Sequence, residues 1–296
     1  EQVNGEQMLN AGSRIRISGH IETGEGETDM QFNGTIFFRL YDSKGTITTK
    51  GNTGDTPFTY TAWNKELGNG SDSVQNGRFS STIIIPKDIN YSDENGRLVF
   101  YAANKDISTE ANGSNEDFLV GGYSEKINTD SVGPDIFMYL NDEDFQDGDA
   151  VNSKPVFVAE LHDESGIQYN GNGIGHDLQL CIDGDPKKTY NLNGYYTQKT
   201  GDYTRGIVSF ADMQELEPGA HWLSFRSWDM LNNTSVKTAK FVVGENIEPE
   251  VLSLMMEEDI VSGHTNFHIG YNFPALTCQF SLEIFSTNGM LQWKKE

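Results

Sequence analysis

The sequence predicts an all-β protein made of tandem immunoglobulin-like β-sandwich domains with an incomplete third sandwich at the C-terminus. Short apolar segments alternate with polar residues at a period of two, which is typical of β-strands. The connections are rich in Asn, Asp and Gly, with 31 glycines in the chain, and such residues favour turns over helices. A length of 296 residues exceeds the usual size of about 100 to 200 residues per domain. We therefore expect more than one domain.

The first domain is predicted over residues 1–128. Residues 13–22 form its first expected strand, because Ile15 and Ile17 alternate with polar side chains. Residues 34–42 and 44–50 are expected to pair as a hairpin. Polar residues 65–77 are predicted to be a loop, and residues 109–117 a polar connection. The further strands are expected at 57–63, 77–86, 97–103 and 118–123.

The second domain is predicted over residues 129–244. Its short strands are separated by turn residues, as in an immunoglobulin-type sandwich. Asp183-Gly184 and Pro218-Gly219 are tight-turn signals within this pattern. The strands are expected at 134–141, 156–163, 176–184, 189–198, 203–210, 219–229 and 237–243.

Residues 245–296 are expected to begin a third sandwich that the chain does not complete. Strand-like segments occur at 251–258, 265–273, 278–285 and 290–295. So few strands cannot close a sandwich, and an open sheet edge promotes aggregation. We interpret this region as a truncated domain.

The charge of the chain excludes several classes of partner. The formal net charge is -23, which repels nucleic acid and anionic lipid. The sequence has no apolar run near the ~20 residues of a membrane span. It opens at Glu1 without a signal peptide, which we interpret as a processed chain or an excised fragment. Cys181 and Cys278 are predicted to lie in different domains, so a disulfide framework is not expected.

The segment 156–184 joins two of the expected strands through a glycine-rich acidic connection, and its GNGIGHD string (171–177) is distinctive. With residues 131–152 and 223–235, and more weakly 77–105, it resembles the region that follows the peptidase domain in PorU-type proteins. These are gingipain-like cysteine peptidases of Bacteroidetes that serve as signal peptidase and sortase of the type IX secretion system. The resemblance covers roughly residues 13–243.

The resemblance implies that this chain is a non-catalytic part of a protease. The catalytic cysteine and histidine of the family belong to a domain upstream, and no position here matches their motif. The implied partners are that peptidase domain, the sorting domains of secreted cargo and outer-membrane secretion components. The implied location is the cell surface. His176 and Asp177 of GNGIGHD either contact the neighbouring peptidase domain or are structural, with Asp177 capping backbone amides after the turn at 173–175.

No catalytic residue and no cofactor is nominated from the residues themselves. Cys181 and His176 are the local thiol and imidazole to test, but five residues of extended strand span about 16 Å and place them on opposite faces. The alternative, a packed strand cysteine, is the favoured interpretation.

Calcium is the one metal that the composition suggests. The candidate ligands lie in the acidic loop at 141–149, although their spacing differs from that of a twelve-residue calcium loop. Solvated turn carboxylates are the other interpretation. The candidates are Asp142, Asp144, Asp147 and Asp149.

A different class of function stays open, that of a free-standing surface module that binds glycan or adhesive partners. Aromatic side chains could form a sugar-binding platform, although in sandwich strands they more often pack in the core or at an edge. The candidates for such a platform are Tyr195, Tyr196, Trp222 and Trp228.

Overall fold

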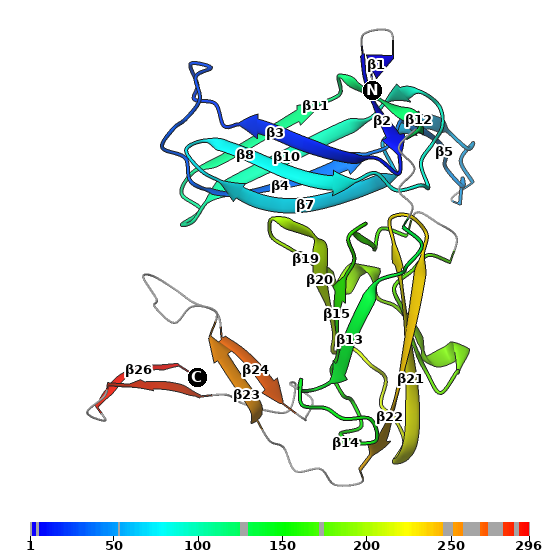
Figure 1. Ribbon diagram of the computed structural model, residues 1–296, viewed down its shortest axis with the longest axis vertical. Helices are drawn as coiled ribbons and strands as arrows, with labels where there is room; N and C mark the ends of the chain where they lie inside the picture. The colour runs from blue at the N-terminus through cyan, green and yellow to red at the C-terminus, as the bar shows by residue number, and fades with distance from the viewer. Residues whose placement is uncertain are drawn as a thin grey trace. The chain divides into compact units, whose positions relative to one another are not determined.

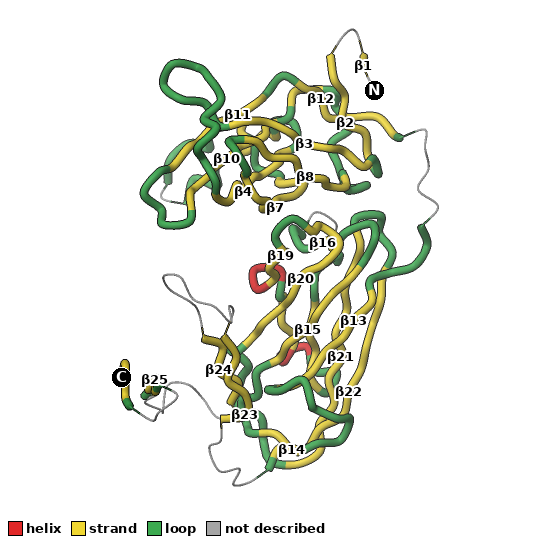
Figure 2. The backbone as a smooth tube through the Cα atoms, turned by 60° about the vertical axis from the view of Figure 1, so that its left-hand side comes forward, coloured by secondary structure: helices red, strands yellow, loops and turns green. Residues whose placement is uncertain are grey.

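The computed structural model is all-β, as the sequence predicts (Figures 1 and 2). It describes residues 2–3, 6–52, 54–124, 130–171, 175–244, 251–256, 267–271, 281–286 and 290–295. The chain forms two compact units, of which the first comprises Glu1–Met138, Val158–Phe210 and Trp222–Ala239. The second comprises Tyr139–Phe157, Ala211–His221 and Lys240–Glu296. The predicted domain boundaries near 128 and 244 remain predictions.

The N-terminal sandwich, which we define as residues 2–124, contains two four-stranded sheets and two strand pairs. The sheets have the orders β1-β2-β12-β9 and β11-β10-β4-β7, and the pairs are β3-β8 and β5-β6. The strands are β1 (Gln2–Val3), β2 (Glu6–Ala11), β3 (Arg14–His20), β4 (Gly34–Tyr41), β5 (Gly45–Thr48), β6 (Thr59–Ala62), β7 (Glu66–Val74), β8 (Arg78–Ile84), β9 (Glu94–Asn95), β10 (Arg97–Asn104), β11 (Glu110–Asn115) and β12 (Phe118–Tyr123).

Alternation places the apolar side chains of these strands in a core of two clusters, and Phe79 and Phe100 pack against both. In β4, Ile36, Phe38 and Leu40 are buried while Phe37 between them is half exposed. Leu67 of β7 is also fully buried in this core. Burying such a side chain contributes about 1.5 to 3 kcal/mol. This core fixes the register of the strands, because a slip by one residue would expose every buried side chain.

Three predictions for this region are wrong. Residues 66–74 form strand β7 and residues 110–115 form strand β11, where the sequence predicted polar connections. The expected hairpin of 34–42 with 44–50 does not form, since β4 pairs with β10 and β7 while β5 pairs with β6. Pairing and packing override the weak strand preference of Gly, Asn and Ser. Gly70 shows this, because a Cβ there would lie 2.8 Å from the Phe38 ring.

The second sandwich, defined as residues 130–244, has strands within each segment that the sequence predicts, but the predicted strand at 189–198 is divided into two, and the short strands at 150–151 and 167–168 were not predicted. One sheet has the order β13-β15-β20-β19, and the other β14-β22-β21-β17-β18, with β16 paired to β21. The strands are β13 (Asp135–Leu140), β14 (Ala150–Val151), β15 (Phe157–His162), β16 (Ile167–Gln168), β17 (Gln179–Ile182), β18 (Thr189–Asn191), β19 (Tyr196–Lys199), β20 (Asp202–Phe210), β21 (Gly219–Asp229) and β22 (Thr234–Val243).

The short connections of this sandwich follow their sequence signals. Asp183 and Gly184 have positive φ angles of 56° and 69°, as a type I′ turn requires. The amide of Asp185 closes the turn on the carbonyl of Ile182 at 3.0 Å. Two single-turn 3-10 helices, η1 (Pro186–Lys188) and η2 (Asn193–Tyr195), lie in the same region.

The C-terminal strands also fall where the sequence predicts them. They form two antiparallel pairs, β23 (Val251–Met256) with β24 (Phe267–Tyr271) and β25 (Leu282–Phe285) with β26 (Leu291–Lys295). Trp293 and Phe285 of the last pair are exposed. The incomplete third sandwich stays a prediction. Cys278 lies outside the described residues.

The described part of the chain contains no helix with the length and apolar character that a membrane crossing requires.

Candidate functional site

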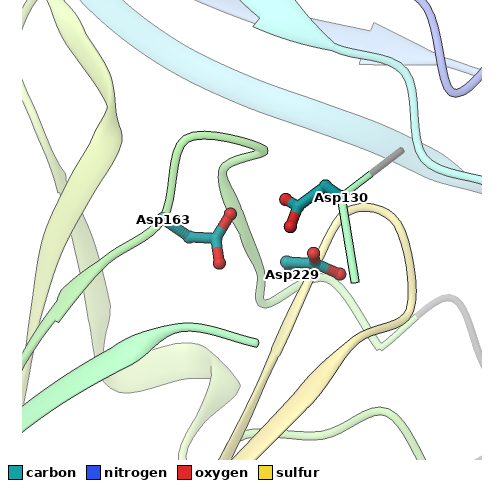
Figure 3. Close-up of side chains that lie close together, drawn as sticks. All are labelled: Asp130, Asp163 and Asp229. Carbon is teal, nitrogen blue, oxygen red and sulfur yellow. The ribbon is translucent and has the colours of Figure 1, made fainter. Parts of the chain in front are cut away.

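Three aspartates converge at one end of the second sandwich, where strands give way to turns (Figure 3). Asp130 precedes β13, Asp163 follows β15 and Asp229 ends β21. One carboxylate oxygen from each lies within 4.8 Å of the others. We call this group the aspartate cluster.

Asp163 is held by the DESG turn that the sequence predicts. Its amide donates to the carbonyl of Thr204 at 2.8 Å, and its Oδ1 accepts from the amide of Ser165 at 2.7 Å. Gly166 has a positive φ of 76° and donates its amide to the carbonyl of Asp163. The side chain is therefore fixed by local turn geometry.

Asp229 organises the turn after β21. Its Oδ1 accepts from the amides of Leu231 at 2.9 Å and Asn233 at 2.6 Å, and its Oδ2 accepts from the Asn233 side-chain amide at 2.7 Å. The side chain is 0% exposed. A buried carboxylate that accepts several amide hydrogens determines the conformation of the turn.

Asp130 is connected to both turns. Its Oδ2 accepts a short hydrogen bond from the Ser165 hydroxyl. Its carbonyl accepts from the side-chain amide of Asn233 at 3.2 Å. Asp130 is thus hydrogen-bonded to Ser165 in the turn after β15 and to Asn233 in the turn after β21.

Burial and nearby negative charges disfavour the charged forms of Asp163 and Asp229. Burial is the main cause that raises the pKa of Asp163 to about 7; the nearby charges of Asp229 and Asp130 act in the same direction, and the hydrogen bond from the Ser165 amide opposes them. Burial also raises the pKa of Asp229, although its hydrogen bonds from Asn233 and Leu231 oppose the change. Like charges that share a low-dielectric site cannot all ionise freely.

Such an arrangement can hold a shared proton or a divalent cation. Calcium takes six to eight oxygen ligands, of which carboxylates are the most common charged type. The sequence analysis did not nominate these residues, because the three lie on separate turns and only the topology unites them. The available signal was an aspartate at the end of β15 and another at the end of β21, each immediately before a turn.

The acidic loop that the sequence nominated for calcium is held by backbone hydrogen bonds. Asp142 Oδ1 accepts from the amide of Asp144 at 2.9 Å, and Asp149 Oδ2 accepts from the amide of Gln146 at 2.7 Å. Asp147 Oδ1 accepts from the amide of Lys240 at 2.6 Å. In the described residues, the three-residue group of potential metal ligands is the aspartate cluster and not this loop. Calcium binding by Asp142, Asp144, Asp147 and Asp149 stays a prediction.

His176 contacts two side chains that are distant in sequence. Its Nδ1 lies 3.2 Å from Asp88 Oδ2, and its ring lies 4.2 Å from the ring of Trp228 between centroids. Asp177 instead accepts from the Asn193 side-chain amide at 2.7 Å. The predicted capping by Asp177 concerns the turn at 173–175, of which residues 173 and 174 lie outside the described part of the chain, and it stays a prediction. Contact of either residue with a peptidase domain stays a prediction.

Cys181 and His176 have different surroundings. Cys181 Sγ accepts a hydrogen bond from the Thr189 hydroxyl at 3.3 Å and lies 3.9 Å from the carbonyl of Asp185. His176 is occupied by Asp88 and Trp228. The structure therefore agrees with the interpretation of Cys181 as a packed strand cysteine.

The aromatic side chains suggested as a sugar platform have separate neighbours. Tyr196 stacks on Tyr169, with ring centroids 4.7 Å apart, and Tyr195 meets Phe210 edge-on at 4.9 Å. Trp222 is 42% exposed, and its ring lies beside Gly184, where an added Cβ would be 3.3 Å from the ring. Trp228 packs on His176 as described above. These contacts are those of core and edge packing.

Within the first compact unit, β7 is hydrogen-bonded to the segment after β16. The Tyr169 hydroxyl accepts from the amide of Asn69 at 3.0 Å and donates to its carbonyl at 3.2 Å. Asn170 Nδ2 donates to the carbonyls of Glu66 at 3.1 Å and Leu67 at 2.9 Å. These hydrogen bonds join residues of the first predicted domain to residues of the second.

Comparison with known proteins finds one informative relative. No protein-family model and no curated protein sequence matches the chain. The crystal structure of dimeric latent PorU from Porphyromonas gingivalis is similar over 98% of this chain, at 30% sequence identity and a TM-score of 0.52. This chain spans 27% of that PorU chain.

Two further solved structures are similar to this chain at much lower identity. The complex of Dpr2 Ig1-Ig2 with DIP-Theta Ig1-Ig3 has 9% identity and a TM-score of 0.22, over 80% of this chain and 61% of that chain. The major pilin subunit BcpA of Bacillus cereus has 11% identity and a TM-score of 0.15, over 94% of this chain and 91% of that chain. The comparison therefore identifies the chain, over nearly its whole length, as similar to one part of PorU.

Proposed function

We propose that this chain is the non-catalytic region downstream of the peptidase domain in a PorU-type sortase of the type IX secretion system. Its role is that of a scaffold and interaction surface. The observation that carries the proposal is the similarity to PorU over 98% of this chain at 30% identity. The GNGIGHD string and its flanking segments, read from the sequence alone, support the same relationship.

The side chains support a structural role for this region. Cys181 accepts a hydrogen bond from Thr189, and His176 lies beside Asp88. The described contacts therefore do not join Cys181 and His176 as a nucleophile and its base. Because the chain spans 27% of the PorU chain, the proposal assigns peptide cleavage to the rest of the parent protein.

The proposed partners follow from the same relationship. The upstream peptidase domain is one, and the sorting domains of secreted cargo and the outer-membrane secretion components are the others. The proposed location is the cell surface. Loops at the ends of rigid sandwiches are the natural contact sites, because the strands hold them in place.

Deletion of this region in the native host tests the proposal. An in-frame deletion of the 296 residues is expected to abolish processing of secreted cargo at the cell surface, because the peptidase domain loses its support. The matched point variant Cys181→Ala is expected to leave processing unchanged. Cargo maturation is read by its change in mass on an immunoblot.

Two results would contradict the proposal. Normal cargo processing after the deletion would show that the region does not serve secretion. Loss of processing in Cys181→Ala, with the protein still present at the surface, would show that the chain takes part in catalysis.

A further inference from the structure

The N-terminal sandwich contains a groove of about 1150 Å³ that residues of β3 and β11 line. Its volume is slightly above that of typical ligand pockets, which measure about 300 to 1,000 Å³. Core side chains line the groove, so its floor is apolar. These include Ile17, Ile36, Leu40, Phe79, Phe100 and Phe118.

One wall of the groove is the unpaired edge of β3. In the described residues β3 pairs with β8 alone. At the two ends of this pair, Ile85 N donates to Ser13 O and Ile21 N donates to Gly77 O. Because antiparallel bonds alternate along a strand, the odd-numbered residues of β3 bond to β8. The N–H and C=O groups of Arg16 and Ser18 therefore face away from β8.

The other wall is the unpaired edge of β11. In the described chain this strand pairs only with β10. Beyond its end, Asn104 N donates to Thr109 O, which sets the alternation. Asn112 and Ser114 consequently present their N–H and C=O groups on the free side, and both residues line the groove. Two open strand edges thus border one apolar floor.

At β3 the rim of the groove carries Arg14 and Arg16, although the chain has a net charge of -23, while Glu22 and Asp117 also line the groove. Ile17 of β3 is buried and Ile15 is partly buried, while Arg14, Arg16 and His20 are exposed on the opposite face. There Arg14 donates to the carbonyl of Glu164 at 3.4 Å, and His20 Nε2 lies 3.0 Å from Glu22 Oε1. Arg16 uses Nε for the Ser80 hydroxyl, at 2.6 Å. A guanidinium has five N–H donors, so others remain for a neighbouring strand.

We propose that this groove binds an extended polypeptide segment in which apolar and acidic side chains alternate. The segment adds a strand to the free edge of β3, a mode in which main-chain hydrogen bonds supply affinity and alternate side chains supply specificity. Its apolar side chains lie on the floor with Ile15 and Ile17. Its acidic side chains lie on the outer face beside Arg14 and Arg16, where opposite charges on adjacent strands attract.

The features that select this occupant are the two open strand edges and the arginines on the outer face of β3. An unpaired edge over an apolar floor is a template for another strand, which proteins normally cover. The arginines favour acidic residues at every second position. The inference depends only on the geometry of this sandwich and not on the role proposed for the parent protein.

The test uses the 296-residue chain and three labelled nine-residue peptides with blocked ends. The first alternates valine with aspartate, the second alternates valine with lysine, and the third is the first with proline at its centre. Fluorescence anisotropy is expected to show micromolar binding of the aspartate peptide. Each cross-strand charge pair contributes modestly, so the lysine peptide is expected to bind at least about fivefold more weakly than the aspartate peptide. The proline peptide is expected not to bind.

Two variants of the chain locate the binding. Arg16→Glu is expected to reverse the preference, so that the lysine peptide binds better than the aspartate peptide. Ser18→Pro removes an N–H that faces the groove and leaves the bonds to β8, so we expect it to abolish binding without changing the unfolding temperature by more than a few degrees. Ser18→Ala is the matched control and is expected to bind normally.

Several results would overturn the proposal. They are the absence of binding, equal binding of the aspartate and lysine peptides, and binding that survives Ser18→Pro in a folded protein. Concentration-dependent self-association that Ser18→Pro abolishes, without peptide binding, would show that a second copy of the chain occupies the groove instead.

Discussion

Asp163→Asn is expected to stabilise the protein by about 2 kcal/mol at pH 8 and to have little effect at pH 4. Burial raises the pKa of Asp163 in the folded state to about 7. In the unfolded chain an aspartate titrates near 3.9. Between these values the folded state binds the additional proton, so the free energy of unfolding falls as the pH rises from about 4 to about 7. Above that range the destabilisation is complete, and asparagine removes it.

Thermal unfolding as a function of pH, in the presence of a chelator, measures this effect. The exposed Asp144 provides the matched control, and Asp144→Asn is expected to leave the pH profile unchanged. A stability difference between wild type and Asp163→Asn that does not vary from pH 4 to pH 8 would contradict the assignment of a raised pKa. A stabilising effect of added calcium on the wild type, absent in Asp163→Asn, would indicate that the cluster holds a cation.

Asp229→Ala is expected to destabilise the protein by about 3 kcal/mol. The substitution removes a buried carboxylate and leaves the amide donors of Leu231 and Asn233 without their acceptor. Unpaired buried donors each cost about 1 to 3 kcal/mol, and relief of the charge repulsion with Asp163 offsets part of that cost. The lost hydrogen bonds all lie in the turn after β21, so we expect the destabilisation to arise there.

The denaturant midpoint and amide hydrogen exchange together test this expectation. Exchange at Leu231 and Asn233 is expected to accelerate most. Asp229→Asn is the conservative control, because it keeps one acceptor oxygen, and a smaller loss is expected. A change below about 0.5 kcal/mol in Asp229→Ala, which is typical of an ordinary surface position, would show that the carboxylate does not hold the turn.

The second sandwich was predictable from the sequence because its signals agree with one another. Alternating apolar residues mark β15, β17 and β21, and Asp183-Gly184 marks a tight turn that the structure contains. Local signals failed at β7 and β11, which are rich in Gly, Asn and Ser. Their strand structure depends on pairing with β4 and β10, which no local pattern encodes.

The candidate site was harder to predict than the fold. Each member of the aspartate cluster reads locally as a turn residue, and the convergence of the three carboxylates depends on topology. His176 was singled out as a contact residue, but its partner Asp88 lies 88 positions away in the sequence. The nominated loop at 141–149 has a high density of acidic residues, yet its carboxylates accept backbone amides.

The central claim is that this chain is the region downstream of the peptidase domain in a PorU-type sortase. Reading the coding sequence on both sides of Glu1 and Glu296 in the source genome tests it most directly. The account predicts a gingipain-like peptidase domain upstream in the same reading frame, with its own cysteine and histidine. A signal peptide directly before Glu1 and no peptidase domain in the frame would contradict it, and would favour a free-standing surface-binding module.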